Sequence, residues 1–522
     1  MTEDAGIDYS HERFSAEEPE VVLRSDAERD ADRVLYSTAF RRMAGVTQVA
    51  STGEVALLHN RLTHSLKVGQ VGRKIAASIN YLAENDDKVR TSCMEFTGIP
   101  YDVGRTEAID PWILESAGMV HDLGHPPFGH IAEKALQTVL SKSPNKGETL
   151  RAPEGCALDD SFEGNAQSFR IVTRLAFGRM SRSQGTEGLN LTRASLSAVL
   201  KYPWRRNDRP NGVDSLKEKW GAYDPETEIL NWATADIGDA REMRRRPDGL
   251  GEWRSLTAQA MDWADDITYA VHDIEDFCRA GLIPVQVLRG ADANGRLLEG
   301  LWDYCRPRLL ENTLIRSKLD GDDTAAAAKV RAIFESVLSG LPNASQSTRA
   351  EREEFRQWSA DRIDFYTLPS QGGLSIISET GFLDIGVEAL LEVELLKKLT
   401  WYFVIDRPAL GSSQRGQAKV IRELFVALWE WCADAYDGPQ FLGPHAGRTN
   451  YTLKSLPPRL IDYLDVSWWQ MPDAHGYKTD GERRSRAVCD FISSLTEKQC
   501  IELHSRLNGA NGVSMLDAWF QV

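Results

Sequence analysis

The sequence predicts a mainly α-helical protein, and three observations carry this prediction. Apolar residues recur at spacings of three and four, the period of an amphipathic helix, at residues 68–79, 390–396 and 420–429. Gly and Pro punctuate the chain between such segments. Alternating strand patterns are scarce, and residues 285–288 are only a weak strand candidate.

The 522 residues, 42% of them hydrophobic, suffice for a sizeable core. We expect an N-terminal arm over residues 1–26, a helical core over 27–430 and a helical C-terminal region over 431–522 that matches no segment we can name. Insertions rich in Pro, Gly or charge are expected in the core at about 141–160, 205–250 and 317–351. The last of these mixes an alanine run with small polar residues, which favours a mobile insertion.

The net charge of -16 argues against broad, non-specific binding to nucleic acid. A phosphate-binding protein with this charge must gather its cations locally or recruit a metal. Seven cysteines without a CxxC pair indicate free thiols in a reducing cytosol, so we expect a cytoplasmic protein. The sequence contains no apolar run of about 18 residues, and we expect no contact with a membrane.

Three of the ten histidines lie between positions 121 and 130. Residues 112–120 are helical in pattern, and Gly124 with the following Pro pair ends this helix, so His121 and Asp122 lie at its C-terminus. Imidazole and carboxylate together suit a divalent ion such as Mn, Fe, Co, Ni or Mg. Alternatively, the segment is a polar helix end with a histidine-rich loop.

Further ligands are offered by two other predicted helices. His64 lies on the apolar stripe of the helix that follows it, where a lone histidine is more often a core residue than a ligand. Asp265, Tyr269 and Asp273 share one helix face, and two carboxylates with a phenol are costly to bury without a cation or polar ligand. A solvated acidic face is the alternative, and spacing does not choose Asp265 over Asp266. Two histidines and two carboxylates from three helices would form a four-ligand site open to water.

An ordered set of short motifs resembles the dGTP triphosphohydrolases of the HD phosphohydrolase superfamily. The motifs are DADRVLYSTAFRRM at 30–43, RLTHSL at 61–66, HDLGHPPFGH at 121–130, FEGNAQ at 162–167, LKYPW at 200–204 and ADDITY at 264–269. The resemblance covers residues 27–280 and continues more weakly to about 430. It implies an HD-domain helical core that hydrolyses a deoxynucleoside triphosphate, dGTP by default. Attack at the α-phosphorus would release the deoxynucleoside and inorganic triphosphate.

The resemblance also implies roles for individual residues. The metal ligands would be His64, His121, Asp122 and Asp265. The metal would be Mn or Mg, and Co, Fe or Ni would also suit the site. His130 matches the catalytic histidine, Glu133 the acid that orients it, and His125 a residue near the phosphates.

Substrate contacts follow from the same resemblance. Tyr269 and Asp273 would contact the sugar, and Gln48 the nucleoside, although Gln48 could equally be a surface residue after a turn. The expected phosphate contacts are Lys201, Tyr202, Lys219 and Arg61. For Arg61 the alternative is a surface salt bridge at a helix start. A looser match at residues 400–406 and 414–417 adds Arg415 and Gln417 as nucleotide contacts.

Family resemblance further implies a homo-oligomer, a hexamer or tetramer. A second, activating nucleotide and, more weakly, single-stranded DNA are candidate effectors. Two other functions compete with this one: another HD phosphohydrolase, such as a phosphodiesterase or nucleotidase, and a non-catalytic nucleotide sensor. Release of inorganic triphosphate would distinguish a triphosphohydrolase from another HD phosphohydrolase. The complete ligand set argues against a non-catalytic sensor.

Overall fold

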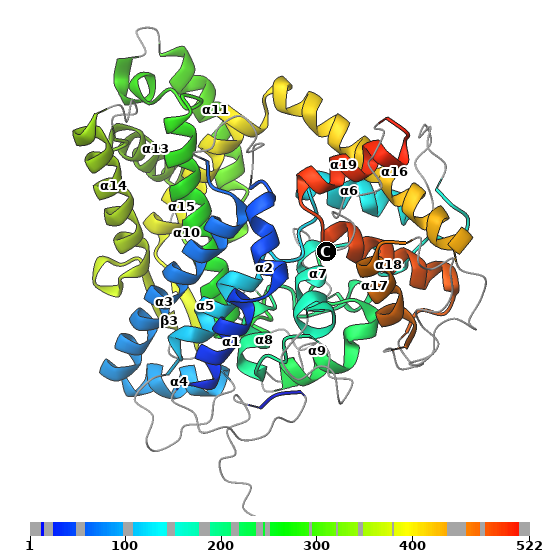
Figure 1. Cartoon of the computed structure of the whole chain (residues 1–522). Helices are drawn as coiled ribbons and strands as arrows, with labels where there is room; N and C mark the ends of the chain where they lie inside the picture. Colours follow the sequence, from blue (N-terminus) through cyan, green and yellow to red (C-terminus); the bar gives the residue numbers. More distant parts are fainter. Residues whose placement is uncertain are drawn as a thin grey trace, which may run out of the picture.

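The computed structural model describes fifteen segments of the chain: residues 12–14, 24–48, 58–97, 108–142, 152–176, 188–209, 219–235, 244–245, 251–291, 295–319, 322–342, 348–377, 380–435, 456–469 and 476–510. Helices predominate throughout these segments, which confirms the predicted mainly α fold (Figure 1). The helices enclose two large hydrophobic cores and one small aromatic cluster.

The first core is built by most of the helices. They are α1 (Asp26–Leu35), α2 (Thr38–Arg42), α3 (Arg61–Asn85), α4 (Asp87–Thr97), α5 (Pro111–Val120), α7 (Gly164–Arg170), α8 (Arg193–Val199), α9 (Thr227–Thr234), α10 (Leu256–Arg279), α11 (Arg296–Leu310), α12 (Thr313–Ser317), α13 (Asp323–Ser339), α14 (Arg349–Thr367) and α15 (Val387–Thr400). Side-chain caps begin many of them, and Asn60 and Thr348 form full capping boxes on α3 and α14. Helix starts are therefore encoded locally, while the apolar faces determine how the helices pack.

The second core joins parts of the chain that are far apart in sequence. It is formed by α6 (His130–Val139), α16 (Pro408–Ala435), α17 (Pro458–Trp469), α18 (Asp480–Ser493) and α19 (Glu497–Leu507), with buried residues from the segment 156–162. These helices lie together on the right of Figure 1. Residue 430, after which we expected the C-terminal region to begin, lies inside α16, and α16 packs against α6 in this core.

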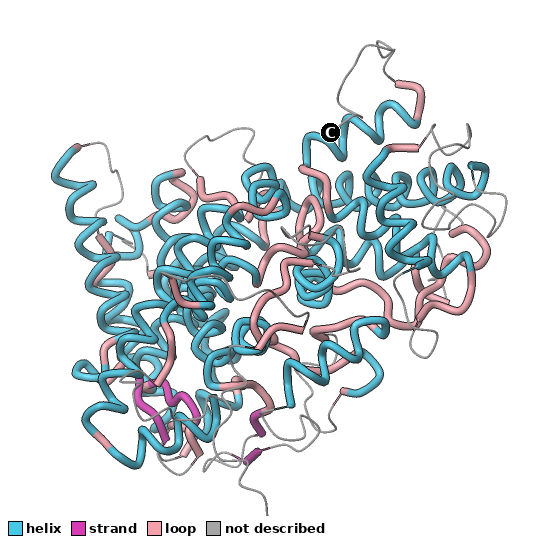
Figure 2. Tube along the Cα trace, turned by 60° about the horizontal axis from the view of Figure 1, so that its bottom comes forward, coloured by secondary structure: helices cyan, strands magenta, loops and turns pink. Residues whose placement is uncertain are grey.

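Two short antiparallel strand pairs complete the described structure. They are β1 (Arg244–Arg245) with β2 (Gly251–Glu252), and β3 (Leu374–Ile377) with β4 (Phe382–Ile385). Figure 2 shows both pairs at the margin of the helical body. The weak strand candidate at residues 285–288 is wrong, because this segment is helical and leads into a π-turn, Val287–Ala291. Val285 and Leu288 lie three residues apart and are both buried. Over only four residues, the pattern of apolar side chains does not distinguish a helix from a strand.

The alanine-rich part of the expected insertion at residues 317–351 is an ordered helix, α13. Asp322 caps its N-terminus, and alanine is the strongest helix former. Its buried face places Val330 and Phe334 in the first core. The segment thus contributes to the core.

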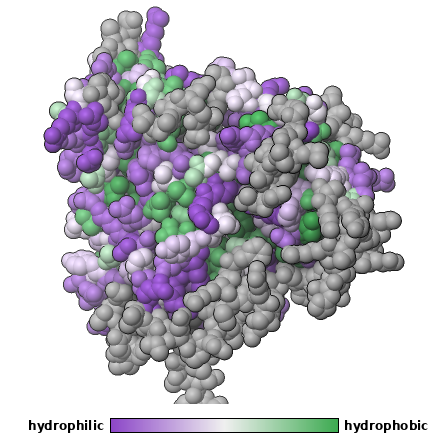
Figure 3. Space-filling model, viewed as in Figure 1, coloured by the Kyte–Doolittle hydropathy of each residue, from purple (hydrophilic) through white to green (hydrophobic). Residues whose placement is uncertain are grey.

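The described surface carries mainly hydrophilic side chains on the face in Figure 3, with small hydrophobic groups among them. Among the described helices, none has both the length and the apolar character that crossing a membrane requires. All seven cysteines are buried and unpaired, which confirms the prediction of free thiols.

Candidate metal centre and active site

His64 and His121 are brought together by the close crossing of α3 and α5. The capping box of Asn60 begins α3, so that His64 lies in its first turn. Further along, a Cβ atom built on Gly118 of α5 would lie 2.6 Å from the backbone nitrogen of Gly69 in α3. Only glycine allows helices to approach so closely. The two imidazole rings consequently lie 5.6 Å apart between centroids.

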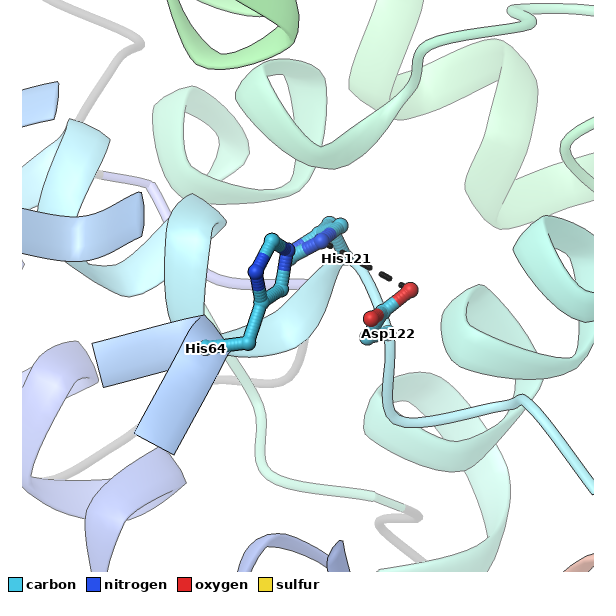
Figure 4. Close-up of side chains that lie close together, drawn as sticks. All are labelled: His64, His121 and Asp122. Atoms are coloured by element: carbon cyan, nitrogen blue, oxygen red, sulfur yellow. Dashed lines mark ion pairs between the residues drawn. The ribbon is translucent and has the colours of Figure 1, made fainter. Parts of the chain in front are cut away.

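His121 and Asp122 follow directly after α5, as the sequence predicts, and His121 is the C-cap residue. Nδ1 of His121 lies 2.7 Å from the carbonyl oxygen of Gly118, so that Nδ1 donates and, in the neutral ring, Nε2 carries the lone pair. This Nε2 atom is buried and has no hydrogen-bond partner. It lies 3.6 Å from Oδ1 of Asp122 and 3.5 Å from Oδ1 of Asp265. Figure 4 shows His64, His121 and Asp122 close together, with a dashed line that marks the ion pair between His121 and Asp122.

Asp265 of α10 supplies the fourth group. Its Oδ1 atom lies 3.1 Å from Nε2 of His64, whereas the carboxylate of Asp266 binds Lys397 at 2.9 Å. One helix turn therefore directs two adjacent aspartates to different partners. The geometry places Asp265, and not Asp266, with the two histidines.

The residues present fit a divalent metal. Ligands about 2.1 Å from one ion lie about 3 to 3.5 Å apart, which is close to the separations between these donor atoms. Burial lowers the pKa of His121, but Asp122 and Asp265 outweigh burial and raise it to about 9. Burial likewise raises the pKa of Asp265, and His121 and His64 bring it well below its usual value. Buried anionic oxygens around an unpartnered imidazole nitrogen are what a divalent cation would satisfy.

Arg61 is buried within this group and is no surface residue. Its guanidinium binds Oδ2 of Asp122 at 2.6 Å. A Cβ atom built on Gly129 would lie 3.0 Å from Nη2 of Arg61. Arg61 thus lies between the ligand Asp122 and the loop that leads to His130.

His130 and Glu133 form a hydrogen-bonded pair in the first turn of α6. Nδ1 of His130 lies 2.7 Å from Oε2 of Glu133, and the His130 side chain is 63% exposed. Burial raises the pKa of Glu133, but His130, His125 and Lys219 together bring it well below its usual value, so that Glu133 is an anion. Nε2 of His130 is therefore the atom available to exchange a proton with solvent or substrate.

His125 links the two groups. Its Nδ1 lies 3.0 Å from Oδ1 of Asp122, and its Nε2 lies 3.6 Å from Oε1 of Glu133. Burial and the Arg61 guanidinium lower the pKa of His125 to about 4, so that it is neutral near pH 7. The ligand atoms of His125, His130 and Glu133 also lie within 4.8 Å of one another. The structure thus brings together all seven residues predicted for metal binding and catalysis.

The two lysines predicted at the phosphates lie beside this cluster. Lys201 forms an ion pair with Asp262, and its Nζ lies 3.6 Å from Oδ2 of Asp265. Nζ of Lys219 lies 3.1 Å from Oε1 of Glu163 and 3.8 Å from Oε2 of Glu133. Both ammonium groups therefore lie among carboxylates at the edge of the cluster.

Four further predicted residues lie in the described part of the chain: Tyr202 next to Lys201, Tyr269 and Asp273 on α10 with Asp265, and Gln48 before α3. Tyr202 is buried in the small aromatic cluster next to Lys201. Tyr269 is half-buried, and Asp273 is buried with an Oδ2 atom that has no hydrogen-bond partner. Burial, Asp276 and Asp265 raise the pKa of Asp273 well above its usual value. Gln48 is half-buried, and its Oε1 atom is buried without a partner.

Arg415 and Gln417 form no described contact with the cluster residues, and their role as nucleotide contacts stays a prediction. Arg415 is exposed and Gln417 half-buried on α16. In the described part of the chain, no hydrogen bond or ion pair links either residue to the predicted ligands. Conversely, sequence reasoning missed Asp262, the partner of Lys201, and it missed Arg42 and Glu497, which contact the loop between His121 and His130. No local pattern marks these residues, because their contacts depend on how distant elements pack.

Comparison with known proteins gives a consistent result. The HD domain model matches residues 61–162 and the phosphohydrolase-associated domain model matches residues 458–506. The second match corrects the expectation that the C-terminal region resembles nothing known.

Similarity to individual proteins extends over nearly the whole chain. The deoxyguanosinetriphosphate triphosphohydrolase-like protein of Corynebacterium efficiens is 31% identical over 94% of this chain and 93% of its own length. That of Streptomyces coelicolor is 30% identical over 95% of this chain and 96% of its own. The chain therefore belongs to the metal-dependent HD-domain phosphohydrolases and, within them, to the family of deoxyguanosinetriphosphate triphosphohydrolase-like proteins.

Proposed function

We propose that the protein hydrolyses deoxynucleoside triphosphates, dGTP by default, to deoxynucleoside and inorganic triphosphate. One observation carries the proposal: His64, His121, Asp122 and Asp265 lie close together, one loop away from a histidine that is hydrogen-bonded to a buried carboxylate. The group of metal-ligand side chains is suited to phosphate activation, and the histidine is suited to proton transfer. The names of the relatives support the substrate class.

His64, His121, Asp122 and Asp265 would hold the divalent ion, Mn²⁺ or Mg²⁺ in this proposal, through the buried atoms described above. When bound, the ion supplies Lewis-acid polarisation of a phosphate oxygen and lowers the pKa of water. The protein itself supplies the remaining requirements, which are proton transfer, phosphate binding and recognition of the sugar.

The proton balance of the reaction assigns a task to His130. The water oxygen forms a bond to the α-phosphorus, the bond from this phosphorus to the 5′-oxygen breaks, and a proton of the water ends on the 5′-oxygen. His130 is placed to move this proton because its Nε2 atom is accessible while Nδ1 is fixed by Glu133. The anionic Glu133 stabilises the imidazolium that forms when His130 holds the proton.

Lys201 and Lys219 lie at the edge of the cluster, where their ammonium groups can bind the triphosphate. Opposing carboxylates outweigh burial and raise the pKa of both ammonium groups, so both are charged near pH 7. Their present partners, Asp262 and Glu163, keep this charge within the site before the substrate arrives. Phosphate oxygens would then replace or share these carboxylate contacts.

Asp273 and Tyr269 are assigned to deoxyribose. The raised pKa of Asp273 and its unpaired Oδ2 atom suit a hydrogen bond with the 3′-hydroxyl. Tyr269 lies one helix turn away on the same face and would exclude a 2′-hydroxyl by its ring. The unpaired amide oxygen of Gln48 is available to the nucleoside.

The test uses the purified protein with each of the four common deoxynucleoside triphosphates, alone and in pairs, with Mg²⁺ or Mn²⁺ in ¹⁸O-enriched water. We expect deoxynucleoside and inorganic triphosphate, with the ¹⁸O label in the triphosphate and none in the nucleoside. Stimulation of one nucleotide's hydrolysis by another would identify an activating nucleotide. Release of only orthophosphate or pyrophosphate would contradict the proposal.

A further inference from the structure

The metal ligands and the proton-transfer pair belong to different hydrophobic cores. The helices α3, α5 and α10, which position the four ligands, pack in the first core. Helix α6, which begins with His130, packs in the second core against the C-terminal helices. The distance between His121 and His130 therefore depends on how the two cores are held relative to each other.

The loop that connects the two groups has an unfavourable backbone conformation. Phe128 has a φ angle of 70° and Gly129 one of 57°, directly before His130. A residue with a side chain adopts a positive φ at a cost on the order of 1 kcal/mol. Such a conformation persists only where surrounding contacts enforce it. The contacts to this loop are therefore decisive for the position of His130.

One of these contacts comes from Glu497, the first residue of α19. Oε1 of Glu497 accepts hydrogen bonds from the backbone nitrogens of Thr47 at 2.9 Å and Phe128 at 3.4 Å, and Oε2 accepts one from Oγ1 of Thr47 at 2.8 Å. The Phe128 side chain packs against the second core. A single carboxylate of the C-terminal region thus touches the loop before α6 and the segment before α3.

Thr47 connects this carboxylate to the metal ligands. It pairs as an antiparallel bridge with Asn60, which caps α3 one turn before His64. Arg42 strengthens the same junction, because its guanidinium donates to the carbonyl oxygens of Leu123 and His125 and to that of Leu495 in the α18–α19 turn. Leu495 and Glu497, two residues apart at the start of α19, are therefore connected to both halves of the site, Glu497 directly and Leu495 through Arg42.

We propose that Glu497 is a positioning residue that fixes His130 relative to the metal ligands by holding Phe128 and Thr47. The phosphohydrolase-associated segment, residues 458–506, is in this view a part of the active site's framework. The expected effect on kcat rests on the proposed function, in which His130 transfers the proton. The structural consequence, a loop held by Glu497, does not.

The first experiment compares Glu497→Gln with Glu502→Gln on the same helix. Glu502 forms only a 3.8 Å ion pair with the exposed Lys498, so it serves as a matched control. In Glu497→Gln an amide group replaces one acceptor oxygen. We expect kcat for triphosphate release to fall about 10- to 100-fold, the range for a small misplacement of catalytic groups. KM and the bound metal per chain should stay unchanged, and Glu502→Gln should behave as the wild type.

The second experiment measures the loop directly by amide hydrogen exchange. We expect faster exchange in peptides that cover residues 123–130 of Glu497→Gln, with unchanged exchange in α10 and α15. A general loss of stability would accelerate exchange everywhere. Thr47→Val, which removes only the hydroxyl donor to Glu497, should give a smaller effect of the same kind and keeps the test valid if Glu497→Gln does not fold.

Unchanged kcat together with unchanged exchange at residues 123–130 in these variants would overturn the proposal. A fall in kcat accompanied by loss of metal would also overturn it, because Glu497 would then support the ligands themselves. If the wild type releases no triphosphate from any deoxynucleoside triphosphate, the proposed function fails, and the exchange experiment still decides whether Glu497 holds the loop.

Discussion

Gly118 of α5 lies so close to Gly69 of α3 that a Cβ atom on Gly118 would lie 2.6 Å from the Gly69 nitrogen and 2.7 Å from its Cα. Both near atoms belong to the backbone, so neither can move aside as a flexible side chain would. This contact allows α3 and α5 to carry His64 and His121 to within ligand distance of one ion. The glycine pair is therefore a condition of the metal centre.

Replacing Gly118 by alanine should separate the two helices. We expect the free energy of unfolding to fall by about 1 to 3 kcal/mol, as for overpacking in a core, and metal affinity to fall with it. Thermal denaturation and metal titration measure the two effects. Gly416→Ala is the control, because nothing lies within 4 Å of a Cβ atom there and α16 should gain up to about 1 kcal/mol. Equal metal affinity in Gly118→Ala and wild type would contradict the prediction.

Metal binding should release a proton from His121. Without metal, Asp122 and Asp265 outweigh burial and raise the pKa of His121 to about 9, whereas a ligand imidazole must be neutral. Metal affinity should therefore rise with pH up to about 9. Calorimetric titration at pH 7 in buffers of different ionisation enthalpy should show release of about one proton per metal. Binding that releases no proton would refute this.

In the metal-free protein, the raised pKa of His121 makes the free energy of unfolding fall as the pH rises. Because the folded pKa of His121 lies above its unfolded value of about 6.5, the protonated group contributes its full stability below pH 6.5. That contribution is lost as the pH rises from 6.5 through 9. Denaturant unfolding of the metal-free protein at several pH values should show this loss, and saturating metal should remove or reverse it.

Asp265 and Asp266 form a matched pair for testing the ligand assignment. Asp265→Asn should weaken metal binding by more than about 100-fold, since even outer-shell partners contribute 10- to 100-fold. Asp266→Asn should retain the metal, because Asp266 binds Lys397, which keeps Glu394 as a partner at 2.6 Å. Metal content after dialysis distinguishes the two. Equal loss in both variants would mean that charge alone, and not geometry, holds the ion.

His130→Ala should lower kcat by about 10² to 10⁴, the usual contribution of general acid–base catalysis. Bound metal should remain, because His130 is not one of the four proposed ligands and is instead hydrogen-bonded to Glu133. Steady-state kinetics with metal analysis provides the measurement. His504→Ala is the histidine control, since His504 pairs with Glu423 between α19 and α16. Turnover in His130→Ala equal to that of the control would remove His130 from the mechanism.

Arg170 links the two cores through a buried ionic network. It is fully buried and binds Asp490 of α18 at 2.8 Å and Glu226 at 2.7 Å. Arg170→Met would leave Asp490 buried with only the neutral amide of Gln167 as a described hydrogen-bond donor, and Glu226 with Arg174 at 4.0 Å. We therefore expect a loss of about 3 to 5 kcal/mol in chemical denaturation. Arg349→Met, in an exposed pair with Glu353, should cost less than about 1 kcal/mol. Similar values for both variants would contradict the prediction.

The sequence by itself determined the helical class, and its motifs predicted the residues of the candidate site. Periodicity and capping residues act over a few positions, so α3, α5 and α10 were predictable, and so was the location of His121 at a helix end. The match of motifs also identified His130, Glu133 and Lys201 as one set. These features are local, or they are encoded in short sequence motifs that occur in a fixed order.

Only the tertiary structure decided how these parts meet. It directed Asp266 to Lys397, buried Arg61 against Asp122, and left Arg415 exposed. It also divided the site between two cores and fastened it with Glu497, about 370 residues beyond the loop that it holds. Such contacts arise when apolar faces of distant helices are buried together. Their partners carry no mutual signature in sequence, because the packing of whole helices, and not any spacing along the chain, sets the distance between them.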